Sequence, residues 1–266
     1  MSDETTNKIG LINLPDMPDS VDNALNNLSN LPTKNIGQTF GDLWYLVFGR
    51  ISYAADKRRL RYSVDLEKYH QELTESINKI PPSNRKEPNI QTTAQALDNS
   101  KYCISSEYLR KMFVKLITCT MNSQLEPYTH PSFPEIIKQM SPLDAELLST
   151  FSKSMSQPIA NFVLSYPDGI TRTVEQYIFF DANGSYSYPY SASISSLERF
   201  GLLSVSFIKR LSEASAYDIF TNFPYFKHLK SECENKYPDA VFEIQKGICT
   251  VTPLGLHFIK SCLPQI

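Results

Sequence analysis

The sequence predicts an α+β protein that is mostly α-helical, with a long helix in its N-terminal region and a winged-helix-like order of elements in its C-terminal region. Over residues 40–80, apolar side chains recur at steps of three and four, which is the spacing of one helical face. After residue 155, the chain becomes rich in β-branched and aromatic residues, which favour strands. We therefore divide the chain into a flexible or partner-ordered arm over 1–35, a helical region over 36–140 and an α+β region over 141–266.

The apolar stripe over 40–80 predicts one long helix, or two helices joined by a kink near Gly49. A continuous helix of this length would extend about 60 Å, which exceeds the width of a small domain. Its apolar face must therefore be buried against another surface. We interpret this face as a contact with a second copy of the chain or with another protein. The side chains assigned to this contact are Phe40, Trp44, Val47, Ile51, Tyr62 and Tyr69.

Two helix starts are predicted close together after residue 130. Ser132 and Glu135 have the S-x-x-E spacing of a capping box, in which each side chain bonds the backbone of the other residue. Ser141 and Asp144 repeat this arrangement, with Pro142 in the first turn, where no backbone donor is needed. Two further helices are expected before them, over 90–99 and 105–121.

The C-terminal region has the element order of a winged helix, in which the helix before the hairpin can enter the DNA major groove. Strands are predicted over 161–166 and 173–180, with the turn residues Pro167, Asp168 and Gly169 between them. The remaining elements are a helix over 194–200 that ends at Gly201, a strand over 202–208, a helical insertion over 210–236, a hairpin with its turn at Lys246 and Gly247, and a last helix from Thr252.

Residues that perform chemistry in other proteins do not form a recognisable group in this sequence. The four histidines lack metal-binding spacing, and motifs for phosphate loops, dinucleotide binding and nucleophile elbows are absent. Carboxylate pairs such as Glu232 and Glu234 fall on predicted helix surfaces, where solvated charge is the default. We therefore expect a protein that is not an enzyme and that uses no cofactor or metal.

Arg50, Lys57, Arg58, Arg59 and Arg61 form the most basic segment of a chain whose net charge is −2. Their pattern favours a solvated helix face with local ion pairs over a contact with phosphate, either in nucleic acid or in lipid headgroups. The apolar and aromatic residues before them leave a second reading open, that of an interfacial amphipathic helix.

The predicted winged helix lacks a basic face. Residues 141–266 contain 10 basic and 12 acidic residues, and the helix over 193–200 carries a single basic side chain, Arg199. Because DNA-binding modules normally present a basic face to the phosphate backbone, this composition favours a protein contact over DNA.

The sequence favours a cytoplasmic location. Its first residues are acidic where a secretory signal would be basic, and the most apolar window, 40–55, is interrupted by Asp42 and Arg50. The five cysteines are odd in number and contain no C-x-x-C pair, which is typical of reduced, buried thiols.

Several sequence runs resemble the Abi-alpha family, a bacterial group named for a proposed link to abortive infection. The runs are Phe40-Gly-Asp-Leu-Trp44, Ala55-Asp-Lys57, Leu109-Arg-Lys-Met-Phe113, Met121-Asn-Ser123 and His130-Pro-Ser-Phe-Pro-Glu-Ile-Ile-Lys-Gln-Met-Ser-Pro-Leu-Asp-Ala145. The resemblance implies a role in defence against phage, with death or dormancy of the infected cell as its proposed output. It supplies no catalytic residues.

These observations lead to one expected function and three alternatives. We expect a non-enzymatic antiphage-defence or phage-response protein that acts through protein contacts and self-association, with a phage-derived trigger among its candidate partners. The first alternative is a DNA-binding winged-helix regulator. The second is an effector that acts at the membrane surface through the segment 44–61. The third is a nuclease or hydrolase whose site no sequence feature identifies.

Overall fold

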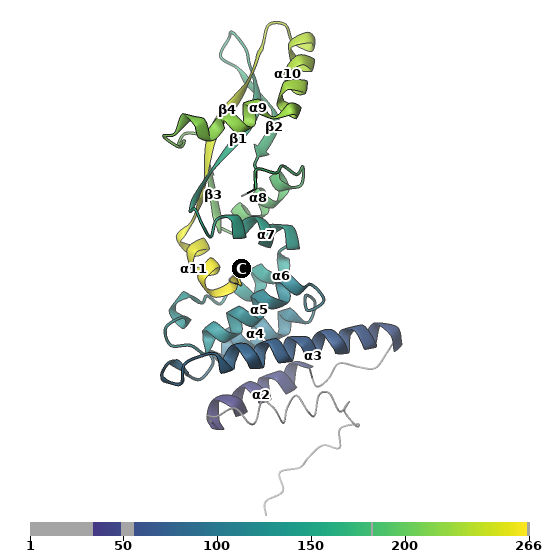
Figure 1. Cartoon of the computed structure of the whole chain (residues 1–266), viewed down its shortest axis with the longest axis vertical. Coiled ribbons are helices and arrows are strands. Elements are labelled where there is room, and N and C mark those ends of the chain that lie inside the picture. The colour runs from purple at the N-terminus through teal and green to yellow at the C-terminus, as the bar shows by residue number, and fades with distance from the viewer. Residues whose placement is uncertain (1–33, 49–55, 182, 265–266) are drawn as a thin grey trace, which may run out of the picture.

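The computed structural model describes residues 34–48, 56–181 and 183–264, which form a helical base with a β-sheet projecting from it (Figure 1). The base is built from helices of the first half of the chain, and the last helix returns to it. The helical elements of the first half are α2 (Lys34–Phe48), α3 (Asp56–Asn78), η1 (Pro82–Asn84), α4 (Ile90–Ser100), α5 (Glu107–Thr120), η2 (Glu126–Tyr128), α6 (Phe133–Gln139) and α7 (Pro142–Thr150). The elements that follow are β1 (Ser156–Ser165), β2 (Thr171–Ile178), α8 (Tyr190–Arg199), β3 (Leu203–Ser206), η3 (Ala214–Tyr217), α9 (Asp218–Asn222), α10 (Pro224–Lys236), β4 (Val241–Val251) and α11 (Pro253–Cys262).

The prediction of one long helix over 40–80 is wrong, whereas the alternative of two helices is present as α2 and α3, which pack against each other. The rings of Trp44 and Tyr69 lie 5.6 Å apart, and that of Phe48 lies 6.3 Å from Tyr69. In a continuous helix, 25 residues would separate Trp44 from Tyr69 by about 37 Å. Gly49 and the residues up to 55 lie outside the described part of the chain. The apolar spacing is the same for a rod and for two packed helices, so the sequence pattern could not distinguish them.

The two predicted helix starts after residue 130 are both present, but only one has the expected cap. Ser141 and Asp144 form the capping box, since Asp144 N donates to Ser141 Oγ at 3.1 Å and Ser141 N donates to Asp144 Oδ2 at 2.9 Å. The capping box at Ser132 is not formed. Ser132 Oγ lies instead 2.7 Å from His130 Nδ1, and Glu135 accepts a hydrogen bond from Asn99 of α4. Glu135 therefore connects two helices instead of capping its own.

The described strands form one antiparallel sheet in the order β2-β1-β4-β3. The predicted hairpin of β1 and β2 is confirmed, with Gly169 at φ +84° in its turn and Asp168 Oδ1 accepting from Ile170 N at 3.0 Å. The predicted end of α8 at Gly201 is also confirmed, since Gly201 has φ +72°.

The second predicted hairpin is wrong, because residues 241–251 form the single strand β4 between β1 and β3. Gly247 is not a turn residue. A Cβ atom there would lie 2.6 Å from Phe207 Cδ1 and 2.9 Å from Ser206 O, so the close approach of β3 requires glycine. The predicted winged helix depended on this hairpin as its wing. The fold is thus a mostly helical α+β structure with an antiparallel sheet, and a winged helix is not shown.

Buried hydrophobic side chains form two clusters within the described residues. The first fills the base and extends to the near end of the sheet, and it includes Phe258 of α11, whose ring lies 5.0 Å from that of Phe133. The second lies between one face of the sheet and η3, α9 and α10, where Phe162, Phe226 and Phe242 contact one another. The outer part of the sheet therefore has a core of its own.

Candidate functional site

The side chains predicted to contact a partner lie mainly in the core of the single chain. Phe40, Trp44 and Tyr69 are fully buried, and Val47 and Tyr62 are partly buried against the same cluster. Ile51 lies outside the described residues. The apolar stripe is thus buried largely by other helices of the same chain. Self-association stays a prediction, and it would need other side chains.

The structure does not describe the side chains of the basic segment. Arg50 lies outside the described residues, and Lys57, Arg58, Arg59 and Arg61 lie at the start of α3, where only the helix itself is described. A contact with phosphate or lipid stays a prediction.

Among the helices that the structure describes, we find none with the length and hydropathy needed to cross a bilayer.

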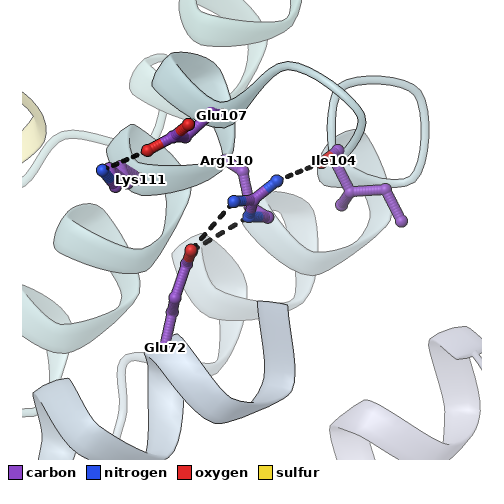
Figure 2. A network of polar contacts seen from close by, with 5 residues as sticks. All are labelled: Glu72, Ile104, Glu107, Arg110 and Lys111. Carbon is purple, nitrogen blue, oxygen red and sulfur yellow. Dashed lines mark hydrogen bonds and ion pairs between the residues drawn. The ribbon is translucent and has the colours of Figure 1, made fainter. Parts of the chain in front are cut away.

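Arg110 of α5 and Glu72 of α3 form a buried ion pair that the sequence analysis missed (Figure 2). Arg110 donates to Glu72 from Nε at 3.0 Å and from Nη2 at 2.9 Å, and it donates from Nη1 to Ile104 O at 2.9 Å. The hydrogen bonds to Glu72 raise the pKa of Arg110 further. Because all three bonds come from one planar guanidinium, this side chain fixes α3, α5 and the turn between α4 and α5 relative to one another.

Arg199, the single basic residue of the predicted DNA-reading helix, is engaged within the chain. It donates from Nη1 to Gln139 Oε1 at 3.4 Å, and its guanidinium lies 4.3 Å from the centre of the Phe200 ring. The helix that carries it, α8, packs against α7, β2 and β3 in the middle of the molecule. These contacts do not favour a groove-reading role for α8.

A strained residue lies where β2 leaves its regular pairing with β1. Tyr177 has φ +56°, a conformation that costs non-glycine residues energy. It is held by three contacts: Tyr177 N donates to Asn161 Oδ1 at 3.0 Å, Tyr177 Oη donates to Glu198 Oε2 at 3.0 Å, and its ring stacks on Phe207 at 6.1 Å. These contacts join the sheet to α8, so we assign this cluster a structural role.

Two turns form the end of the sheet that is farthest from the base, one between β1 and β2 and one between α10 and β4 (Figure 1). Ser165 at the end of β1 pairs with Thr171 on one side and with Val241 on the other. The adjoining turns leave Ile170 61% exposed and Val241 63% exposed. We call residues 167–170 and 237–241 the distal tip. The distal tip therefore carries two exposed apolar side chains at one end of the sheet.

A groove of about 1040 Å³ is lined by α5, η2, α7, α11 and the loop between β2 and α8. Three lysines from separate segments line it: Lys115 from α5, Lys153 from the link between α7 and β1, and Lys260 from α11. Lys115 is half-buried, and Lys260 Nζ lies 4.1 Å from the centre of the Tyr128 ring. The apolar part of the wall is formed by Leu125, Leu147, Ile259 and Leu263. The sequence analysis missed this groove, because its residues are distant along the chain.

The acidic residues of the groove are Asp181 and Glu146. Asp181 is already engaged by its own loop: Oδ1 accepts from the backbone N of Asn183 and of Ser185, both at 2.8 Å, and Tyr190 Oη donates to Oδ2 at 3.4 Å. None of the three lysines forms an ion pair with a carboxylate that the structure describes. The donors to Asp181 are neutral and hold its carboxylate in place without removing its charge, so the three lysines and two carboxylates of the lining sum to a formal charge of +1.

All five cysteines lie within the described residues and are buried as free thiols. Burial raises the pKa of each thiol, to about 11 for Cys119 and to about 12 for Cys249. A thiol needs a lowered pKa to act as a nucleophile at neutral pH, so these cysteines are placed as core residues. Within the described residues, no three His, Cys, Asp or Glu side chains are grouped so that they could hold a metal ion.

Comparison with known proteins identifies one family. A family model described as abortive infection alpha matches residues 61–262, which is well over half of the chain. The matched range contains Arg110, the distal tip and the three lysines of the groove, whereas Arg50, Lys57, Arg58 and Arg59 precede it. No curated protein and no solved structure matches the chain.

Proposed function

The chain belongs to the abortive infection alpha family, and on this basis we propose that it acts in abortive-infection defence against phage through protein contacts, without catalysing a reaction. In this proposal, the helical base serves as the scaffold and the distal tip contacts the partner.

The observation that carries the proposal is the separate core of the outer sheet. Phe162, Phe226 and Phe242 pack the outer part of the sheet against α10 without help from the base. A projecting element with its own core can present Ile170 and Val241 in a fixed geometry. Preorganised contact residues lower the entropic cost of binding, so this arrangement supports a recognition role for the tip.

The thiol environments also support a non-catalytic role. Each cysteine is buried and has a raised pKa, so the thiols, which are the most nucleophilic side chains of the chain, are not accessible to solvent. The Arg110–Glu72 pair, the most buried ion pair among the described residues, connects two helices inside the base. Its geometry is that of a structural contact.

Site-specific photo-crosslinking in infected cells tests the contact at the tip. A photo-reactive amino acid is placed at Val241, and the matched control places it at Ile90, which is also exposed but lies on α4 in the base. We expect a discrete crosslinked protein with the probe at position 241 and none at 90. Equal crosslinking at both positions, or none at either, would contradict a contact through the tip.

Self-association is part of the proposal and is tested separately. Native mass spectrometry of the full chain should give a mass above that of the 30.3 kDa monomer. A crosslink at Val241 to a second copy of the chain would place the self-contact at the tip. A monomeric mass at all accessible concentrations would remove self-association from the proposal and leave the partner contact to stand alone.

A further inference from the structure

We propose that the groove lined by α5, α7, α11 and the loop between β2 and α8 binds a small phosphorylated organic molecule of nucleotide size, with Lys115, Lys153 and Lys260 holding its phosphates. This ligand site does not depend on the distal tip, so it extends the proposed function without relying on it.

The charge distribution around the groove selects an anion. Three lysines line the groove, from α5, from the link before β1 and from α11, and none of them is paired with a carboxylate that the structure describes. The lining also contains the carboxylates of Asp181 and Glu146, and that of Asp181 is held by three hydrogen bonds from neutral groups of its own surroundings. The formal charge of the lining is therefore +1.

The lysines favour phosphate among anions. An ammonium group is a compact point charge with three donors, which suits the oxygen atoms of a phosphate chain. Lys260 is also positioned, because its ammonium group lies 4.1 Å from the centre of the Tyr128 ring. Among the described residues no carboxylate pairs with Lys260, and the contact with the ring limits the directions that the side chain can adopt.

The groove has room for more than an inorganic ion. Its volume of about 1040 Å³ is just above the range of about 300–1,000 Å³ that is usual for small-molecule sites. A free phosphate would leave most of it filled with water. Part of the wall is apolar, so the ligand is expected to have an organic body beside its phosphates.

Calorimetric titration of the full chain tests the site with three probes: ATP, inorganic triphosphate and adenosine. We expect ATP to bind most tightly, triphosphate to bind more weakly and adenosine to bind weakest, because phosphate and organic body both contribute. Binding of triphosphate as tightly as ATP would reduce the site to an anion site and overturn the assignment of an organic ligand. If none of the three probes gave a heat of binding above the baseline, the groove would not be a ligand site.

Matched lysine variants locate the binding. Lys115→Gln and Lys260→Gln should each weaken ATP binding about tenfold, the usual loss when one charge-assisted contact is removed. Lys227→Gln, an exposed lysine of α10 outside the groove, should bind as the unmodified chain does. Unchanged thermal unfolding midpoints show that each variant is folded. Equal weakening by all three variants, or by none, would contradict a site in this groove, whatever the crosslinking at the tip shows.

Discussion

Arg110 and Glu72 lie 38 residues apart and share two hydrogen bonds, of 3.0 and 2.9 Å, that join α5 to α3. The Arg110 side chain is 7% exposed and that of Glu72 is 27% exposed. We expect Arg110→Ala to lower the free energy of unfolding by about 2–3 kcal/mol, because it leaves a partly buried carboxylate and the Ile104 carbonyl without their donor. Denaturant unfolding of the two proteins measures this loss.

The neighbouring pair of Lys111 and Glu107 provides the control, since it lies on the same helix but in solvent (Figure 2). Lys111→Ala should cost less than about 1 kcal/mol, because exposed ion pairs contribute little. Equal losses for Arg110→Ala and Lys111→Ala would mean that burial does not set the strength of the Arg110–Glu72 pair.

Gly247→Ala should destabilise the chain, whereas Gly41→Ala should stabilise it. A Cβ at Gly247 would clash with Phe207, at a cost of about 1–3 kcal/mol. A Cβ at Gly41, inside α2, has no neighbour within 4 Å, and alanine favours the helix there by about 0.5–1 kcal/mol. Thermal unfolding of the two variants should thus shift in opposite directions. A tolerated alanine at Gly247 would argue against the packing of β3 on β4.

Asn161 should contribute more to stability than its partner Gln245. The buried Asn161 amide accepts from Tyr177 N at 3.0 Å and donates to Gln245 Oε1 at 2.9 Å. Asn161→Ala removes the acceptor that holds the strained Tyr177 backbone, so we expect a loss of about 1–3 kcal/mol. Gln245→Ala removes the acceptor of the Asn161 amide at an exposed position, where water can replace it, and should cost about 0.5–1 kcal/mol. Amide hydrogen exchange at Tyr177 should become faster in Asn161→Ala and not in Gln245→Ala. A larger loss of stability in Gln245→Ala than in Asn161→Ala would refute this role of Asn161.

The stability of the fold should fall as the pH rises above about 9. In the unfolded chain the thiols lose their protons near the ordinary value of 9.0, but burial raises the pKa to about 11 for Cys119 and about 12 for Cys249. Between these values the folded state holds more protons than the unfolded state, so added base favours unfolding. Unfolding midpoints from pH 8 upward measure the slope, and Cys249→Ala should lessen it. A midpoint that is independent of pH across this range would contradict the raised pKa values of the buried thiols.

Elements with local signals could be predicted from the sequence. The turn at Asp168 and Gly169, the end of α8 at Gly201, the capping box at Ser141 and the start of α11 at Thr252 all depend on residues within one turn of each other. Their geometry is therefore readable from short motifs.

The errors arose where distant residues decide the structure. Gly247 resembles a turn residue, but the reason for glycine is Phe207, which is 40 residues away. The packing of Trp44 on Tyr69, the Arg110–Glu72 pair and the convergence of lysines on the groove likewise depend on contacts between separate elements. A periodic pattern identifies a buried helical face, but it does not identify what buries it.

Protection of cells against phage is the direct measure of a contact function at the distal tip. Plating efficiency is compared for cells that express the full chain, the double variant Ile170→Asp/Val241→Asp, or the control Ile90→Asp at matched protein levels. We expect the unmodified chain and the Ile90 variant to lower phage plating equally, and the double variant, shown to be folded by its thermal unfolding midpoint, to fail to do so. Full protection by the double variant would refute a contact function at the distal tip.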